Sequence, residues 1–183
     1  MKTIIATNIT GGNPKEKRSK NDYYPTPPEV TTALLDYLDL PKSCVIWEPA
    51  CGENDMVEAI KNRGYSVIGT DIIYGYDFLK EPLYNCDWII TNPPFTLSDQ
   101  FIEKCAKYEK PFALLLKSQY WHAKKRYNVF LKYPPTVICP LTWRPDFNFK
   151  TRRKKNASPL MDVMWCIWIP PYTNKTIYEP LTK

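Results

Sequence analysis

Short apolar runs recur along the chain, and turn residues bound each of them. The runs are rich in β-branched and aromatic side chains, which favours buried strands. Strands are predicted at residues 44–47, 65–70, 87–91, 112–116, 136–141 and 161–169. Apolar residues recur at helical spacing within 26–38, 54–63, 98–106 and 119–131. Strands that alternate with helices predict an α/β fold.

The segment 44–70 has the order strand, helix, strand, and such a unit pairs its two strands in parallel. With 161–169 expected to pair antiparallel, we predict a mainly parallel central sheet that has a C-terminal antiparallel strand and helices on both faces. The 183 residues suffice for one well-buried core. We expect a flexible N-terminal arm at 1–22, one folded domain at 23–170 and a C-terminal tail at 171–183.

Positive charge is concentrated in three places. The net charge is +6, and basic residues cluster at 15–20, 124–126 and 150–155. Clusters of this kind favour a phosphate backbone, so nucleic acid is the expected partner. The first cluster lies in the polar arm and is interpreted as solvated surface.

The sequence shows neither a targeting signal nor closely spaced cysteines. No apolar run is long enough to cross a bilayer, and the N-terminal apolar stretch is too short for a signal-peptide core. The six cysteines form no CxxC pair, which predicts reduced thiols and no metal site. We therefore expect a soluble, cytoplasmic protein with no membrane partner.

Two loops, at 48–54 and 92–95, follow runs that are predicted to be buried strands. In open α/β sheets, ligands bind at this carboxyl edge. Ala50 and Gly52 let backbone N–H groups approach a ligand closely, and Asp71, about twenty residues further on, suits ribose hydroxyls. Because a single glycine does not make a GxGxxG fingerprint, a nucleotide-like cofactor without phosphates is favoured over a dinucleotide.

Five short segments carry a resemblance to a known family. They are Tyr-Pro-Thr-Pro-Pro-Glu-Val at 24–30, Glu-Pro-Ala-Cys-Gly at 48–52, Gly-Thr-Asp at 69–71, Asp-Phe-Leu at 77–79 and Asn-Pro-Pro-Phe at 92–95. Because these segments occur in this order, the chain resembles the adenine-N6 DNA methyltransferases, in particular small phage-borne ones. The resemblance implies a Rossmann-like methyltransferase fold and S-adenosylmethionine as cofactor. It also implies DNA or, alternatively, RNA as partner, in a prokaryotic or phage-infected cell.

The resemblance implies that the first two segments hold the methionine end of the cofactor. Thr26, close to Tyr24, would hydrogen-bond the methionine carboxylate. Glu48 and the backbone around Ala50 and Gly52 would receive the ammonium group.

The next two segments would hold the nucleoside end. Asp71 would bind the two ribose hydroxyls, a task that suits a carboxylate. Asp77 would accept from the adenine amine, and Phe78 would line the adenine ring. Asn54 stands where many relatives have a second glycine.

By the same resemblance, residues 92–95 would carry the reaction. An exocyclic amine is a weak nucleophile because its lone pair is delocalised into the ring. The Asn92 side-chain oxygen and the Pro93 backbone oxygen would accept its two hydrogens and free the lone pair, so no strong base is required. Pro93 and Pro94 would stiffen the loop, and Phe95 would stack on the base. A base inside a duplex must first be flipped out.

The later region offers further parts. Residues 144–149 resemble the variable aromatic segment that closes over the flipped base, which makes Phe147 the candidate for the second face of that base. The predicted phosphate contacts are Arg152, Arg153, Lys154 and Lys155. Relatives that read a target sequence usually carry a sizeable recognition domain, for which 79–88 leaves no room. Little or loose sequence recognition is therefore expected.

Other functions remain open at this stage. Loops of the Asn-Pro-Pro-Phe/Tyr type also serve methyltransferases of RNA bases and of a glutamine side chain, and the basic clusters disfavour only the protein substrate. A catalytically silent nucleic-acid-binding module of the same fold is a further alternative. The presence of Thr26, Asp71 and Asn92 argues against it.

Overall fold

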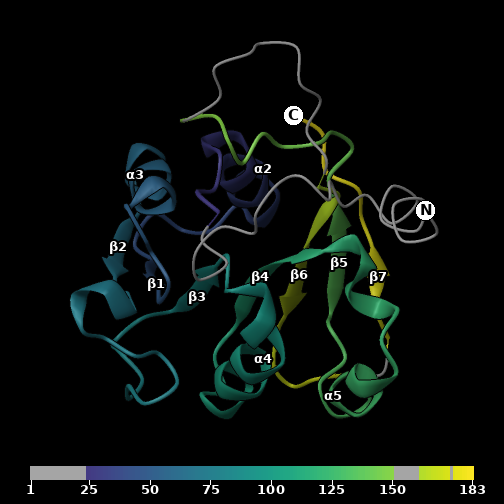
Figure 1. Ribbon diagram of the computed structural model, residues 1–183. Coiled ribbons are helices and arrows are strands. Elements are labelled where there is room, and N and C mark those ends of the chain that lie inside the picture. The colour runs from purple at the N-terminus through teal and green to yellow at the C-terminus, as the bar shows by residue number, and fades with distance from the viewer. Residues whose placement is uncertain (1–23, 151–160, 174) are drawn as a thin grey trace, which may run out of the picture.

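One sheet organises the computed structural model, which describes residues 24–150, 161–173 and 175–183 (Figure 1). In these residues the strand order is β2-β1-β3-β4-β6-β5-β7. The strands are β1 (Val45–Glu48), β2 (Ser66–Gly69), β3 (Trp88–Thr91), β4 (Phe112–Lys117), β5 (Val137–Pro140), β6 (Val163–Trp168) and β7 (Ile177–Tyr178). The predicted arm at 1–22 and the predicted phosphate contacts at 152–155 lie outside the described residues.

Strand direction confirms the predicted fold class. β1 pairs in parallel with β2 and β3, and β3 pairs in parallel with β4. β6 enters between β4 and β5 and is antiparallel to both. The chain runs from β1 to β2 on one side and then returns to β3 on the other side, so the strand order reverses between β1 and β3. In open α/β sheets this reversal point opens a crevice at the carboxyl ends of the strands.

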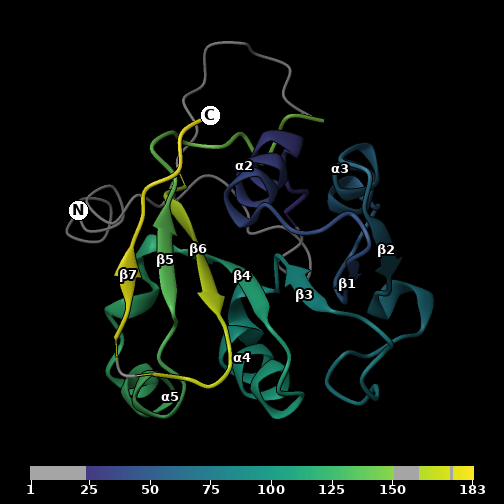
Figure 2. The ribbon, with the colours of Figure 1, turned by 180° about the vertical axis from the view of Figure 1, so that it is seen from behind.

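Helices cover both faces of the sheet (Figures 1 and 2). α2 (Pro28–Leu38) and α3 (Asp55–Asn62) contribute to one hydrophobic cluster, and α4 (Ser98–Lys107) contributes to the other. Trp165 and Trp168 of β6 are both fully buried, the first in the α2 and α3 cluster and the second in the α4 cluster. The central strands are therefore buried on both sides, as parallel strands usually are.

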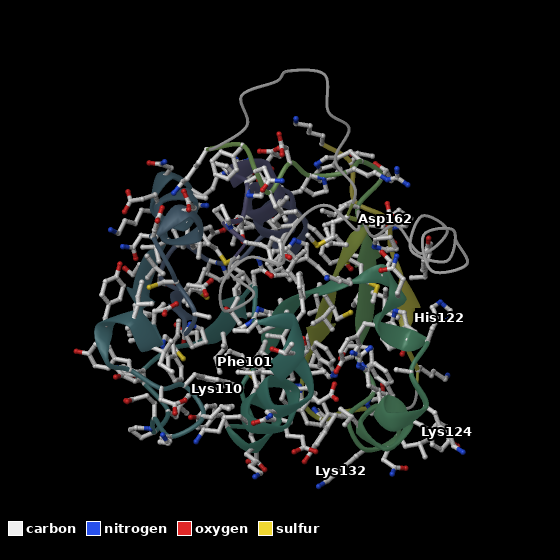
Figure 3. All side chains as sticks on the ribbon, viewed as in Figure 1. Phe101, Lys110, His122, Lys124, Lys132 and Asp162 are labelled. Carbon is white, nitrogen blue, oxygen red and sulfur yellow. The ribbon has the colours of Figure 1, made fainter. Side chains whose placement is uncertain are left out.

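The helix predicted at 119–131 is broken. It consists of η4 (Ser118–Trp121), η5 (Lys124–Arg126) and α5 (Tyr127–Lys132), with Ala123 in an extended conformation. Tyr120 and Trp121 both contact Phe130, with ring centroids 5.3 Å and 4.3 Å away. Neighbouring positions of a continuous helix point about 100° apart, which would separate these two side chains. His122, the one histidine in the sequence, is exposed nearby (Figure 3).

The segment predicted as a tail, 171–183, extends the sheet. It contributes β7, which pairs in parallel with β5. Leu181 is buried and joins the core on the α2 side. Elsewhere in the described residues, η2 (Ile72–Tyr74) follows β2 and η3 (Phe95–Leu97) precedes α4. None of the helices in residues 24–150, 161–173 and 175–183 combines the length and apolar character of a membrane span.

Candidate active site

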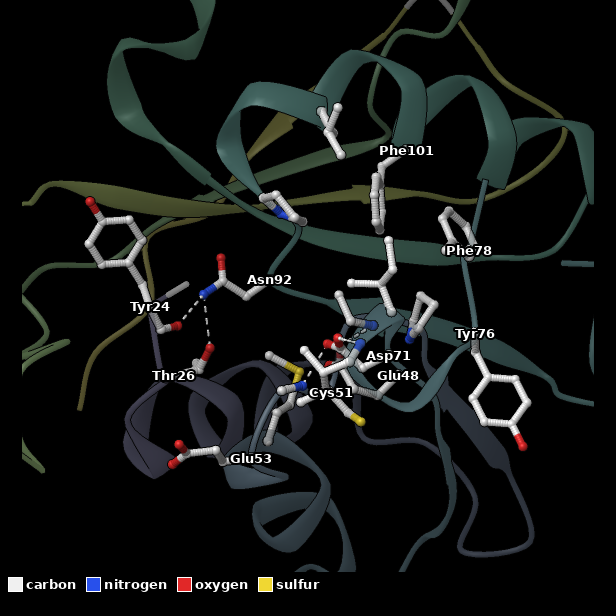
Figure 4. A pocket seen from close by; sticks show the side chains of 18 of the residues that line it. Tyr24, Thr26, Glu48, Cys51, Glu53, Asp71, Tyr76, Phe78, Asn92 and Phe101 are labelled. Atoms are coloured by element: carbon white, nitrogen blue, oxygen red, sulfur yellow. Dashed lines mark hydrogen bonds between the residues drawn. The ribbon is translucent and has the colours of Figure 1, made fainter. Parts of the chain in front are cut away.

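A cavity of about 310 Å³ lies where β1 and β3 end (Figure 4). Both loops that the sequence singled out line it, so the two strand ends open into one space. All eight predicted cofactor-binding residues contribute to the lining, as do Asn92 and Pro94. The eight are Tyr24, Thr26, Glu48, Ala50, Gly52, Asp71, Asp77 and Phe78.

The loop after β1 turns sharply into α3. Gly52 and Asn54 both have a positive φ, of 50° and 70°. This left-handed conformation is tolerated by glycine and by asparagine but strained for most other residues. The backbone conformation at Asn54 is one that glycine would also adopt, so asparagine in place of the expected second glycine is compatible with this turn.

Asp71, just after β2, connects the loop after β1 with the turn after β2 through hydrogen bonds. Its Oδ2 accepts from the Gly52 backbone N–H at 2.8 Å, and its Oδ1 accepts from the Ile73 N–H at 2.9 Å. The Tyr74 hydroxyl donates to the Gly52 carbonyl at 2.9 Å. Each carboxylate oxygen still has a lone pair to offer toward the cavity. Asp71 can thus shape the loop and bind a ligand hydroxyl at once.

Glu48 ends β1 as a fully buried carboxyl group. Its Oε1 accepts from the Thr91 hydroxyl at 2.5 Å and from the Ala50 N–H at 3.1 Å. Its Oε2 is buried and has no hydrogen-bond partner among the described residues. Burial raises the pKa of Glu48 to about 8, with a further contribution from Asp71 and against the effect of the two hydrogen bonds. A cationic donor in the cavity would satisfy Oε2 and favour the ionised form.

Asn92 follows β3, and its side chain is held in one orientation (Figure 4). Its Nδ2 donates to the Tyr24 backbone carbonyl at 3.1 Å and to Thr26 Oγ1 at 3.0 Å. Because a carbonyl oxygen can only accept, these bonds fix which end of the amide is nitrogen. The other end, Oδ1, is buried and lacks a partner in the described part of the chain. The amide therefore reserves one acceptor for a donor that enters the cavity.

Aromatic side chains wall the side of the cavity near α4. Phe78 is buried, and its ring centroid lies 4.6 Å from that of Phe101 and 5.3 Å from that of Trp47. Asp77 lies beside it, where its Oδ2 pairs with Lys80 at 2.9 Å and its Oδ1 accepts from the Leu79 N–H. The hydrogen bond from Lys80 is the main cause that lowers the pKa of Asp77.

The rings of Tyr24 and Phe95 lie side by side, with centroids 5.7 Å apart. Lys117, the last residue of β4, places its Nζ 4.4 Å from the Phe95 centroid and 5.9 Å from that of Tyr24. Pro93, Phe95 and Phe147 are not among the residues that line the cavity.

Phe147 occupies a different place from the one its predicted role implies. It is only 4% exposed, and it packs edge-on against Tyr24 at 6.2 Å, within the core on the α2 side. Its ring therefore supports Tyr24 from behind in this structure. A second face for a flipped base would have to come from elsewhere or from a movement of this segment.

Three solved structures illustrate the similarity of this fold to known proteins. A putative class I S-adenosylmethionine-dependent methyltransferase from Listeria monocytogenes aligns with 84% of this chain and 63% of its own, at 16% identity and a TM-score of 0.57. A modification subunit of a putative type I restriction enzyme from Vibrio vulnificus aligns with 86% of this chain and 47% of its own, at 14% identity and a TM-score of 0.59. A dimethyladenosine transferase from Plasmodium falciparum aligns with 81% of this chain and 63% of its own, at 14% identity and a TM-score of 0.58.

This chain has the Rossmann-like methyltransferase fold. It spans less than two thirds of the length of each of those three proteins. No protein-family model matches the sequence, and a comparison with curated proteins finds no significant match. The fold prediction is confirmed, and the assignment of a reaction depends on the cavity itself.

Several residues around this methyltransferase-fold cavity were not singled out from the sequence. Lys117 ends an apolar strand next to β3, so the carboxyl-edge rule could have found it. Lys150 was counted only as part of a basic cluster. Its Nζ lies 2.6 Å from Asp55 Oδ1 and 3.1 Å from Glu53 Oε2, and both acids line the cavity. No local signal in the sequence connects Lys150 with residues nearly a hundred positions earlier.

Proposed function

We propose that the protein is an S-adenosylmethionine-dependent methyltransferase that acts on the exocyclic N6 amine of adenine in DNA, with loose sequence recognition. The observation that carries this proposal is the orientation of Asn92. Two hydrogen bonds hold its amide nitrogen, and its buried Oδ1 lacks a partner in the described residues, in a cavity shared with the Glu48 loop.

The residues of the cavity fit this cofactor. The buried, unpartnered Oε2 of Glu48 suits an ammonium group, because a buried acceptor without a partner is costly and a charged donor satisfies it best. Asp71 keeps lone pairs for ribose hydroxyls, and the wall of Phe78 and Phe101 suits a planar ring. The loop has no glycine-rich phosphate cradle, which agrees with a cofactor that has no phosphates. When bound, the cofactor supplies an electrophilic methyl group on sulfur.

Asn92 and Pro93 then prepare the target amine. The Asn92 Oδ1 accepts one hydrogen of the amine. The other is accepted by the backbone oxygen of Pro93, which follows Asn92 directly but is not itself among the residues that line the cavity. The nitrogen is drawn toward a tetrahedral geometry, and its lone pair is released from the ring. The same two oxygens stabilise the positive charge that develops on nitrogen during transfer, and a proton is afterwards lost to solvent.

This mechanism requires no general base. The lining of the cavity contains no histidine. Of its carboxyl groups, Asp71 is held by the Gly52 and Ile73 N–H groups. The Oε2 of Glu48, which has no partner among the described residues, is assigned to the ammonium group of the cofactor. Catalysis then rests on acceptors fixed in advance, which need no reorganisation when the amine arrives.

Nucleic acid as the substrate is supported by charge and by the similar structures. The net charge is +6, and the type I modification subunit and the dimethyladenosine transferase are named for modification and adenosine chemistry. Phe95, flanked by Tyr24 and Lys117, offers an aromatic surface beside the catalytic acceptor. Aromatic rings next to cations are typical of sites that stack unpaired bases.

Nucleoside mass spectrometry can test the proposal. The protein is expressed in a host that lacks adenine methylation, and both DNA and RNA are digested and analysed. We expect N6-methyladenine in DNA with the wild type and none with Asn92→Ala, which should still fold because Asn92 lies at the surface of the cavity. Methylation found only in RNA would show that RNA, and not DNA, is the substrate. Methylation that survives Asn92→Ala would show that Asn92 has no part in the mechanism.

A further inference from the structure

Thr26 has an unusual position for a threonine in front of a helix. A threonine there often caps the helix with its hydroxyl. In this structure the N-cap of α2 is Pro27, and no side chain makes a capping hydrogen bond. The Thr26 side chain is 5% exposed and lines the cavity. Its hydroxyl is therefore assigned to the cavity and not to the helix.

Within the described part of the chain, the hydroxyl of Thr26 accepts a hydrogen bond but does not donate one. Its oxygen accepts from Asn92 Nδ2 at 3.0 Å. Among the described residues, its hydrogen is donated to no acceptor. A hydroxyl can donate and accept at the same time, so an anionic acceptor in the cavity can take this hydrogen while the bond from Asn92 persists.

We propose that the Thr26 hydroxyl couples cofactor binding to the orientation of Asn92. It would donate its hydrogen to the carboxylate of the cofactor and accept from the Asn92 amide at the same time. This inference rests on the proposed function. Thr26 would then contact the cofactor and also position Asn92. It would thereby connect the part of the cavity that holds the cofactor with the part that holds the target amine.

The coupling has a clear physical direction. A hydroxyl that donates to an anion becomes a stronger acceptor, because hydrogen bonds in a chain polarise one another. Cofactor binding thus strengthens the bond that Thr26 accepts from Asn92 and holds Oδ1 in place for the target amine. Thr26 is β-branched and stiff at χ1, so the hydroxyl can transmit this constraint without rotating away. The Tyr24 carbonyl supplies the second, ligand-independent restraint on the amide.

The chain offers a matched control. Thr31, one turn into α2, is fully buried, and its Oγ1 has no partner among the described residues. Replacing Thr31 by valine removes a buried threonine hydroxyl from the adjoining helix, at a residue that does not line the cavity. Thr26→Val removes the hydroxyl with nearly the same shape, and Thr26→Ser keeps it.

The first test uses nuclear magnetic resonance and the product analogue S-adenosylhomocysteine. The side-chain amide signals of Asn92 are identified by their loss in Asn92→Ala. We expect them to shift when the analogue saturates the wild type, Thr26→Ser and Thr31→Val, and to stay in place when it saturates Thr26→Val. A shift in Thr26→Val equal to that in the wild type would overturn the coupling.

The second test separates binding from chemistry. At saturating S-adenosylmethionine, single-turnover methylation by Thr26→Val should be about tenfold slower, the equivalent of one net hydrogen bond. Thr26→Ser should restore the rate. If Thr26→Val weakens cofactor binding and leaves the saturated rate unchanged, Thr26 is a cofactor contact only and the coupling is wrong. A wild type that does not bind S-adenosylhomocysteine at all would instead overturn the proposed function, and the coupling with it.

Discussion

The Thr91 hydroxyl donates a 2.5 Å hydrogen bond to Glu48 Oε1 and so joins the ends of β3 and β1. The two residues lie 43 positions apart in the sequence. Asn92 follows Thr91 directly, and the loop that starts at Pro49 follows Glu48. The loops proposed to carry the reaction and to hold the cofactor are therefore connected by a buried polar contact where they leave the sheet.

Removing this contact should cost stability. Thr91→Val keeps the shape of the side chain but leaves Glu48 Oε1 with only the Ala50 N–H. We expect a loss of about 1–3 kcal/mol in the free energy of unfolding, measured by urea denaturation. Thr91→Ser retains the hydroxyl and should recover most of that loss. A Thr91→Val variant as stable as the wild type would show that the hydrogen bond contributes nothing to stability.

Cofactor affinity should depend on pH through Glu48. Because burial raises the pKa of Glu48 to about 8, the empty protein carries a neutral carboxyl below that pH. An ammonium group binds the carboxylate, so affinity for S-adenosylhomocysteine should rise with pH, by up to about tenfold per unit, and level off near pH 8. Calorimetry between pH 6 and pH 8.5 measures this dependence. Glu48→Gln should flatten it, and a profile unchanged by that substitution would contradict the assignment.

The same titration should appear in the stability of the empty protein. The folded-state pKa of Glu48 lies above its ordinary value of 4.5. Its contribution to stability is therefore fully present below pH 4.5 and is lost as the pH rises through 8. In Glu48→Gln, the decrease in stability across this range should be smaller than in the wild type, as measured by denaturation at a series of pH values.

Asp71 should matter for the fold as well as for binding. Asp71→Asn replaces one acceptor oxygen by an NH₂ group, which would face the N–H of Gly52 or of Ile73. We expect a loss of about 1–3 kcal/mol in unfolding free energy together with weaker cofactor binding. Asp36→Asn is the control, since Asp36 is exposed and pairs with Arg63 at the surface. A stable Asp71→Asn would show that the loop does not depend on this carboxylate.

The basic run after Phe149 should contribute to DNA affinity without sequence specificity. Replacing Arg152, Arg153, Lys154 and Lys155 by glutamine should weaken DNA binding evenly across unrelated sequences and reduce its dependence on salt. Fluorescence anisotropy at several salt concentrations measures both effects. A loss limited to one sequence context would mean that the run reads bases.

The strand ends could be predicted from the sequence because they depend on local patterns. Apolar runs locate β1 and β3, and the parallel βαβ rule brings their carboxyl ends to the same edge. The broken helix after β4 was not predicted, because the helical spacing of its apolar residues does not show that Tyr120 and Trp121 both pack on Phe130. The sheet-forming role of Ile177–Tyr178 also depends on a distant strand.

The hydrogen-bond partners of the site residues could not be predicted from the sequence either. The bond from Asn92 to Thr26 spans 66 positions, and only the folded chain assigns the amide nitrogen to it and leaves the oxygen unpartnered. Phe147 was predicted from resemblance, and its burial against Tyr24 follows from packing that the local sequence does not encode. Residue identity thus indicated most of the side chains that line the cavity, and tertiary contacts decide which atom each one offers.

Cys51 lies in the lining of the cavity, and this position carries a chemical risk. In a methyltransferase, a thiolate beside the electrophilic methyl group would be alkylated, and the protein would be inactivated. Burial, followed by the nearby Glu48 and Asp71 carboxyl groups, raises the pKa of Cys51 to about 12. The sulfur therefore stays protonated and weakly nucleophilic at neutral pH. Burial, together with the carboxyl groups that are proposed to bind the methyl donor, would thus protect the protein from self-methylation.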